Sequence, residues 1–391
     1  MDIDGFSKTG LRNLKTPCFI ISEQALKRNL EILAAVQKDA GCRILLAQKA
    51  FSYYPLYKEI KKHLYGVCAS GLNEARLGHE EFGREVHVHA PAFSDEDFTQ
   101  ILKYATHIVF NSVSQLQRFR PAALKKKIKI GLRLNPETSV AGEKFGIYDP
   151  CCPASRLGIT AGNLIGNLTG ISGLHFHALC EQGVDPLIKV LNAFEKKFSH
   201  IIQNISWINF GGGHHITSDN YDRKTLSGLI KAFKKKYPGI REVYLEPGEA
   251  VVMNTAVMAI SVLDIIKNGR RRIAVTDTSV EAHILDVLLT RHEKIPYIPE
   301  IIGAGRPGKF KYNYLLGGIS CAAGDIIGEY SFPEPLYCGQ KLILNDMAYY
   351  TMVKFTMFNG VNLPRIYHLG SNGKCKTVWN PGYAEYKKNL F

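Results

Sequence analysis

The first two-thirds of the chain alternates short apolar runs with longer amphipathic segments. The apolar runs have the length of buried strands and end at turn-forming residues. The segments between them repeat apolar residues at helical spacing, as in residues 23–36, 71–82 and 185–202. The runs predicted as strands are residues 43–47, 65–69, 85–89, 107–110, 127–134, 171–177, 207–210 and 242–245.

Eight strand-like runs alternating with helices predict an α/β fold built as a parallel (β/α)8 barrel. A doubly wound open sheet is the competing architecture, because it uses the same alternation. After about residue 250 the long helical patterns largely vanish and β-rich runs dominate. We therefore expect a barrel over residues 23–250 and a C-terminal β domain over 251–391. The predicted strands there are residues 251–262, 272–276, 312–316, 340–344 and 348–355.

The N-terminal segment, residues 1–22, contains one further strand-like run at residues 18–22. This run either joins the β domain or leads into the barrel. The total length of 391 residues agrees with two domains, because one hydrophobic core rarely grows beyond about 250–300 residues. With 46% hydrophobic and 21% charged residues, the composition is that of a soluble globular protein and argues against disorder.

The sequence contains neither a transmembrane pattern nor a secretory signal. The most apolar stretch, residues 250–266, includes Asn254 and Asp264 and is shorter than the roughly 20 apolar residues a span needs. The N-terminus lacks a basic and apolar leader. The nine cysteines are an odd number without C-x-x-C spacing. We therefore expect reduced thiols in a cytoplasmic protein, with no membrane partner.

The formal net charge of +14 raises the question of a nucleic-acid partner. The basic residues are scattered, however, and the densest runs are only three residues long, at 125–127, 234–236 and 270–272. We interpret the first two as solvated faces or ends of helices. Since no nucleic-acid motif accompanies the charge, we expect no nucleic acid as partner.

Several residues at predicted strand ends could carry chemistry. Gly211–Gly213 follow the strand 207–210, where backbone N–H groups could hold a phosphate, although a tight turn is the alternative. Lys49 follows the strand 43–47 and could form a Schiff base, or be a surface lysine. Glu246 ends the strand 242–245 and could keep a pyridine nitrogen protonated, or be a solvated carboxylate.

Two further motifs could take part in chemistry. His175 and His177 share one face of a strand, and one of them could stack on a cofactor ring; without a third ligand at recognisable spacing we expect no metal. Cys321, four residues before Asp325, lies in a glycine-rich segment and could be a proton donor or a small buried residue.

Taken in order, these motifs resemble a known family. LLAQKA, HFH, FGGG, LEPG, a cysteine before an aspartate, and YYT…FNG are similar to the fold-type III pyridoxal-phosphate (PLP) decarboxylases, the alanine-racemase-like group. The match covers roughly Thr16 to the C-terminus. SRLG, HFHALCE, NFGGGHHIT and GGISCAAGD resemble carboxynorspermidine/carboxyspermidine decarboxylases of bacterial polyamine synthesis.

The resemblance implies roles for individual residues. It implies Lys49 and Cys321 as catalytic residues, with Lys49 also carrying the cofactor. It implies that Glu246 contacts the pyridine nitrogen, or the substrate near it. The other cofactor-binding residues implied are Arg133, His177, Gly211, Gly212, Gly213 and Tyr350, and the other substrate-binding residues are Glu181, Asp286 and Asp325.

The resemblance also implies a reaction: decarboxylation of carboxynorspermidine or carboxyspermidine to norspermidine or spermidine. It further implies a homodimer in which Cys321 and Asp325 enter the partner's active site. Alternative hypotheses are a related decarboxylase acting on diaminopimelate, ornithine or arginine, and a non-catalytic PLP-carrier barrel. The C-terminal β domain argues against the carrier, because such carriers are single barrels.

Overall fold

The structure, a computed structural model, describes residues 13–391, without the side chains of residues 143–145. It divides into two compact units: residues 28–251, and the segment up to Lys27 together with residues 252–391. Residues 1–12, which belong to the N-terminal segment of the prediction, lie outside the described residues.

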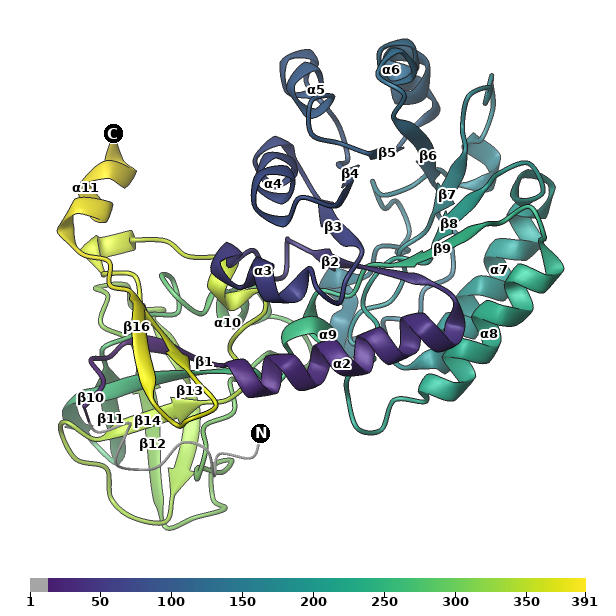
Figure 1. Ribbon diagram of the computed structural model, residues 1–391. Helices are drawn as coiled ribbons and strands as arrows, with labels where there is room; N and C mark the ends of the chain where they lie inside the picture. The colour runs from purple at the N-terminus through teal and green to yellow at the C-terminus, as the bar shows by residue number, and fades with distance from the viewer. Residues whose placement is uncertain (1–12) are drawn as a thin grey trace. The chain divides into compact units, whose positions relative to one another are not determined.

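The unit of residues 28–251 is a closed barrel of eight parallel strands (Figure 1). The last strand pairs in parallel with the first, with Arg43 opposite Tyr244, and this pairing closes the barrel. The predicted barrel is therefore confirmed, and the open sheet is excluded. The strands are β2 (Arg43–Ala47), β3 (Gly66–Ala69), β4 (Glu85–His89), β5 (His107–Phe110), β6 (Lys129–Arg133), β7 (Gly173–His175), β8 (Trp207–Asn209) and β9 (Glu242–Leu245).

Helices follow the strands along the chain and bury one face each. In α7, for example, Leu187, Leu191 and Phe194 recur at helical spacing and are buried. The helices of the chain are α2 (Glu23–Ala40), α3 (Tyr57–Ile60), α4 (Leu72–Leu77), α5 (Asp95–Ile101), α6 (Val113–Lys125), α7 (Val184–Ile202), α8 (Arg223–Lys236), α9 (Glu249–Val252), α10 (Leu285–Leu289) and α11 (Tyr383–Leu390).

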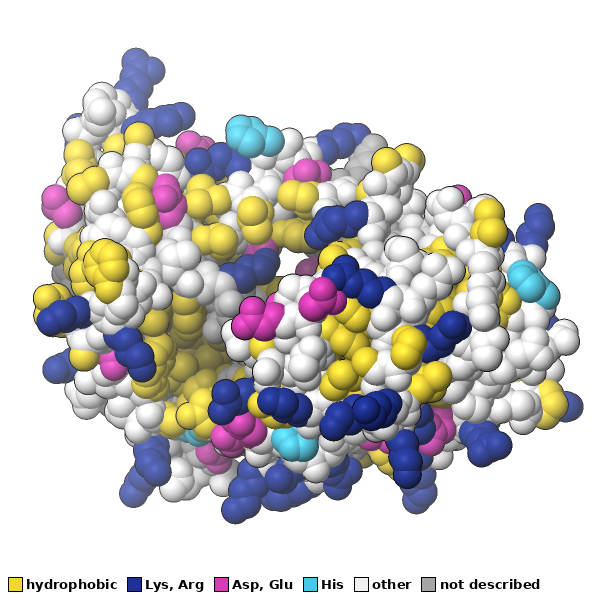
Figure 2. Space-filling view, turned by 90° about the horizontal axis from the view of Figure 1, so that it is seen from above, with side chains coloured by type: hydrophobic (Ala, Val, Ile, Leu, Met, Phe, Trp, Pro, Cys, Tyr) yellow, Lys and Arg dark blue, Asp and Glu magenta, His cyan; other side chains and the backbone are white. Residues whose placement is uncertain are grey.

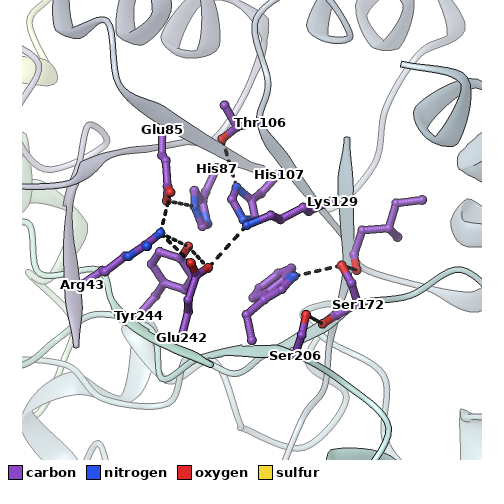
Figure 3. Close-up of polar contacts among 12 residues, drawn as sticks. Arg43, Glu85, His87, Thr106, His107, Lys129, Ser172, Ser206, Glu242 and Tyr244 are labelled. Atoms are coloured by element: carbon purple, nitrogen blue, oxygen red, sulfur yellow. Dashed lines mark hydrogen bonds and ion pairs between the residues drawn. The ribbon is translucent and has the colours of Figure 1, made fainter. Parts of the chain in front are cut away.

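The amino-terminal end of the barrel is filled by side chains (Figure 3). Trp207 lies where Gly131 and Gly173 leave room, since a Cβ on Gly173 would come within 1.9 Å of the indole. Arg43 forms ion pairs with Glu85 at 2.7 Å and with Glu242 at 2.8 Å. These contacts close the base of the barrel, so a substrate must enter at the carboxyl end, where active sites of such barrels lie.

The second unit is an eight-stranded sheet in the order β13-β12-β11-β10-β1-β15-β16, with β14 paired to β10. The N-terminal run joins this sheet: β1 pairs antiparallel with β10 and parallel with β15. Its side chains contribute to a core with Val257, Ala259 and Tyr367. The strands are β1 (Cys18–Ser22), β10 (Ala256–Asn268), β11 (Arg271–Thr276), β12 (Tyr312–Gly317), β13 (Ile326–Phe332), β14 (Lys341–Leu344), β15 (Arg365–Leu369) and β16 (Cys375–Trp379).

One predicted strand of this unit is wrong. Residues 348–355 contain a short 3-10 helix, Thr351–Val353, instead of a strand. Tyr350 has φ +54°, a left-handed backbone conformation that breaks a β ladder. The prediction also missed β13, β15 and β16, in which polar and apolar residues do not alternate cleanly, and the short, largely polar helix α11.

The surface charge agrees with the scattered basic residues of the sequence. Lys and Arg side chains are spread over the face shown in Figure 2, with Asp and Glu among them. The runs 125–127 and 234–236 lie at the carboxyl ends of α6 and α8, as predicted. In the described part of the chain, no helix is both long enough and apolar enough to cross a membrane.

Candidate active site

Lys49 lies at the carboxyl end of the barrel, two residues after β2. The preceding Gln48 is fully buried and fixed on both sides: its Nε2 donates to the Glu74 carbonyl at 2.8 Å, and its Oε1 accepts from the Tyr57 hydroxyl at 3.0 Å. The Lys49 side chain itself is exposed. The backbone is thus held rigidly while the amine stays accessible, as a nucleophilic lysine requires.

The turn after β9 packs directly on this segment. The backbone N–H of Ala47 donates to the Pro247 carbonyl at 3.4 Å, and a Cβ on Gly248 would come within 2.4 Å of the Ala50 Cβ. Only glycine allows this approach. The contact brings the segments of Lys49 and Glu246 together, although they are nearly 200 residues apart in sequence.

The glycine loop lies against the ends of neighbouring strands. Gly211 and Gly213 have φ +73° and +81°, which other residues rarely adopt. A Cβ on Gly212 would lie 2.3 Å from the Glu246 carbonyl oxygen. The Gly212 N–H donates to His177 Nδ1 at 2.8 Å. The loop therefore has to be glycine, and it fixes the orientation of the His177 ring.

Glu246 is the centre of a network that the sequence did not predict. Its Oε1 accepts from Asn209 Nδ2 at 2.6 Å, and its Oε2 lies 3.2 Å from His175 Nε2. Burial by itself raises the pKa of Glu246, but the contacts with His175 and Asn209 outweigh it and lower the pKa to about 2. Glu246 is therefore a largely buried carboxylate, with its side chain 13% exposed, that stays charged at neutral pH.

Arg133, at the end of β6, is a buried cation in the same barrel end. Its Nη1 donates to His89 Nε2 at 2.9 Å, and its Nη2 donates to the His177 carbonyl at 3.4 Å. Burial lowers its pKa to about 10, so it keeps its charge at neutral pH. Among the described residues, no carboxylate forms an ion pair with it. A buried guanidinium without such a partner suits an anionic group of a bound molecule.

The histidines of this region are neutral. Burial lowers the pKa of His177 well below its ordinary value, and the charges of Lys49 and Arg133 lower it further. Burial and the Arg133 charge also lower the pKa of His89. His177 and His89 are therefore neutral rings beside the charged Arg133 and Glu246.

Glu181 is the remaining predicted residue of the barrel unit, and two residues that the prediction missed accompany it. His215 Nε2 lies 3.1 Å from Glu249 Oε2, and a ligand atom from each of Glu181, His215 and Glu249 falls within 4.8 Å of the others. Glu249 is the glutamate of EPGE, three residues after Glu246. A carboxylate so close in sequence to a predicted one, at the start of α9, was the available signal.

Cys321 and Asp325 belong to the other unit. Cys321 is exposed. Asp325 is buried, and its carboxylate accepts from the backbone N–H of Val280 at 2.8 Å and of Ser320 at 3.0 Å. The carboxylate thus fixes the loop that carries Cys321.

The remaining two predicted residues also lie in this unit. Asp286 forms an ion pair with Lys354 at 2.6 Å, and the same ammonium lies 4.9 Å from the centre of the Tyr350 ring. A cationic substrate would therefore have to compete with Lys354 for Asp286. The structure brings Lys49, His177, the glycine loop, Arg133 and Glu246 to one barrel end, and it groups Asp286 with Tyr350.

Residues 19–348 match the family described as "Pyridoxal-dependent decarboxylase, C-terminal sheet domain". The chain belongs to this family, and it is an enzyme that uses PLP to remove a carboxylate. The alternative of a non-catalytic PLP carrier is therefore wrong.

Within this family the chain is most informatively compared with polyamine-pathway decarboxylases. The chain is 40% identical to carboxyaminopropylagmatine decarboxylase of Synechocystis sp., over 97% of this chain and 96% of the relative. It is also 40% identical to carboxynorspermidine/carboxyspermidine decarboxylase of Campylobacter jejuni, over 95% and 98% of the two chains. The crystal structure of carboxynorspermidine decarboxylase complexed with norspermidine, from Campylobacter jejuni, superposes with a TM-score of 0.87 at 39% identity, over 96% of this chain and all of that one. The predicted resemblance is confirmed.

The residues at the barrel end fit PLP. Its ring nitrogen needs an anionic partner, and Glu246 is a largely buried, charged carboxylate without a lysine or arginine within ion-pair distance among the described residues. Its phosphate needs backbone amides or cations, and the glycine loop and Arg133 lie at the same barrel end. Its aldehyde needs an accessible amine, which Lys49 offers.

Proposed function

We propose that this enzyme decarboxylates a carboxylated polyamine, carboxynorspermidine or carboxyspermidine, to norspermidine or spermidine in polyamine biosynthesis. The observation that carries the proposal is the 40% identity to the Campylobacter jejuni enzyme over nearly the full length of both chains. The matched stretch spans 95% of this chain and therefore extends over both units. Diaminopimelate decarboxylase of Archaeoglobus fulgidus, in contrast, is only 21% identical.

In this proposal the barrel holds the cofactor. Lys49 would bind the aldehyde, and His177 would lie against the ring. The residues that would hold the phosphate are Gly211, Gly212, Gly213, Arg133 and Tyr350. Bound PLP supplies an electron sink for the electron pair that remains when the carboxylate leaves. The Glu246 carboxylate keeps a proton on the ring nitrogen, because its pKa of about 2 leaves it charged throughout the neutral range.

A proton must then return to the carbon that lost the carboxylate. Cys321 or Lys49 delivers it in our proposal, since the Cys321 thiol is exposed and the Lys49 amine is accessible. A cationic substrate also needs anionic contacts to offset the positive net charge. Glu181 and Glu249 supply two carboxylates near the glycine loop, and Asp286 and Asp325 are further candidates.

Carboxyaminopropylagmatine is a second candidate substrate, because the Synechocystis relative is as similar as the Campylobacter jejuni one. The two candidates differ at one end of the molecule, where an agmatine derivative has a guanidinium and the norspermidine derivative has an ammonium. A carboxylate pair such as Glu181 and Glu249 can bind either cation, so the contacts described above do not separate the two substrates.

Release of CO2 from a panel of substrates tests the proposal. The panel contains carboxynorspermidine, carboxyspermidine, carboxyaminopropylagmatine, diaminopimelate, ornithine and arginine. We expect the highest kcat/KM for carboxynorspermidine or carboxyspermidine. A higher kcat/KM for carboxyaminopropylagmatine would favour the second candidate, and a preference for an amino acid would refute both.

We further propose a homodimer with shared active sites, as the family resemblance implies, in the cytoplasm. Two observations support these proposals. Cys321, which the resemblance assigns to the partner's site, is exposed, and all nine cysteines are free thiols, as expected in a reducing compartment.

A further inference from the structure

Both oxygens of the Glu246 carboxylate have a side-chain donor. Asn209 Nδ2 donates to Oε1 at 2.6 Å, and His175 Nε2 lies 3.2 Å from Oε2. The three residues lie at the carboxyl ends of three consecutive barrel strands, β7, β8 and β9. Since a charged carboxylate only accepts, the proton of this contact is on His175 Nε2.

The other side of the His175 ring agrees with a neutral imidazole. Nδ1 is buried and has no hydrogen-bond partner, which suits a nitrogen without a proton. Burial lowers the pKa of His175, and the charges of Arg133 and Lys49 lower it further against the opposing effect of Glu246. The ring is also stacked against His89, at 5.6 Å between centroids, and His89 in turn accepts from Arg133.

We propose that His175 is a positioning residue for Glu246: its neutral imidazole donates a fixed hydrogen bond that keeps the carboxylate charged and oriented for the cofactor's ring nitrogen. This inference rests on the role of Glu246 under the proposed function. Asn209 acts on the other oxygen and also accepts from the Gly211 N–H at 2.9 Å, so it ties the carboxylate to the glycine loop.

Other ionisable groups lie near His175 and Glu246 and affect the pKa values of these two residues. Lys49 follows β2, Cys68 and His87 come from β3 and β4, Arg133 from β6 and His177 follows β7. The Cys68 thiol also forms a side-chain hydrogen bond with Glu246. The nitrogen donors are His175 Nε2 at Oε2 and Asn209 Nδ2 at Oε1. Removing His175 should therefore change Glu246 specifically.

Three variants of the holoenzyme test the inference. His175→Phe keeps a ring of similar size and removes the donor, and His175→Gln keeps a donor. His107→Phe is the matched control, because His107 is a buried histidine of the same barrel whose pKa burial also lowers, and it has no contact with Glu246. We measure kcat and KM separately, the pH dependence of the bound cofactor's absorbance, and each effect again in the Glu246→Gln background.

We expect His175→Phe to lower kcat about 10- to 100-fold with little change in KM, as for a lost hydrogen bond to a charged group. The cofactor absorbance should titrate at a higher pH on its acidic limb, because the carboxylate is then less stabilised. His175→Gln should recover part of both effects. In Glu246→Gln, adding His175→Phe should cost less than about threefold, because the two changes act through one group.

Three results would overturn the inference: wild-type kcat and absorbance titration in His175→Phe, an equal loss in His107→Phe, or fully additive effects with Glu246→Gln. Near-normal turnover of Glu246→Gln would instead refute the proposed role of Glu246 itself. If His175→Phe does not fold, nitrogen NMR of the wild-type protein can show which nitrogen of the His175 ring carries the proton. A proton on Nδ1 in place of Nε2 would contradict the inference.

Discussion

The imidazole rings of His87 and His107 stack at the base of the barrel, with their centroids 3.7 Å apart and their planes inclined by 18° (Figure 3). Arg43 and Lys129 carry positive charges in the same cluster, and Glu85 and Glu242 balance them. The charges of these two cations and two carboxylates cancel one another. Burial lowers the pKa of His107 far below its ordinary value, and the charges of His87, Lys129 and Arg43 lower it further.

Because the pKa of His107 is lowered in the folded protein, we expect the protein to lose stability in acid. The unfolded chain takes up a proton on His107 below about pH 6.5, whereas the folded protein does not, so the free energy of unfolding falls as the pH drops below about 6.5. One such group contributes a slope of about 1.4 kcal/mol per pH unit. We measure the free energy of unfolding with urea at pH 7.5, 6.5 and 5.5. In His107→Phe this free energy should change less with pH than in the wild type, by the slope that one proton contributes. An unchanged slope would contradict this prediction.

Lys49 should carry the cofactor covalently. We expect an absorbance band above about 400 nm in the purified protein, which borohydride reduction converts into a stable label on the Lys49 peptide. Lys49→Ala should lack both. A label found on a different lysine would show that the accessible amine after β2 is not the attachment site.

Glu246→Gln should lower turnover far more than cofactor affinity. The amide is neutral and cannot hold a proton on the ring nitrogen, and a loss of at least about 100-fold in kcat is expected. Cofactor affinity is measured by absorbance titration of the cofactor-free protein. Equal losses in affinity and turnover would indicate a purely structural role for Glu246.

Glu249→Gln should raise KM for a polyamine substrate with little change in kcat, because it removes one negative charge beside Glu181. We expect an increase of about 5- to 30-fold, the effect of about 1–2 kcal/mol of binding energy. Glu137→Gln is the matched control, since Glu137 forms an exposed ion pair with Lys197 in the same unit. A comparable KM increase in the control would attribute the effect to overall charge.

Mixing inactive variants tests the shared active site. Lys49→Ala and Cys321→Ala should each be nearly inactive. After subunit exchange their heterodimers have one intact site, and activity should approach about a quarter of wild type for random pairing. A mixture of Lys49→Ala with Glu246→Gln should stay inactive, because both lesions belong to the barrel. If the first mixture also stays inactive after mass spectrometry has verified exchange, the sites are not shared.

The sequence by itself determined the barrel and the chain positions of its chemistry. Strands of a parallel barrel are buried on both faces, so they appear as continuous apolar runs, and residues that follow them, such as Lys49 and Glu246, lie at the carboxyl end by topology alone. The glycines of the loop after β8 were visible for the same reason. The sequence was less informative for β13, β15 and β16, whose polar and apolar residues do not alternate cleanly.

Only the tertiary structure decided which side chains meet. His175 and Glu246 are 71 residues apart and come within hydrogen-bond distance through the register of β7, β8 and β9. The tertiary structure likewise brings His215 to Glu249. It also brings the backbone N–H groups of Val280 and Ser320 to the Asp325 carboxylate. Local patterns of hydrophobicity set the strands, but strand register and barrel closure set these distances, because they depend on packing between residues far apart in the sequence.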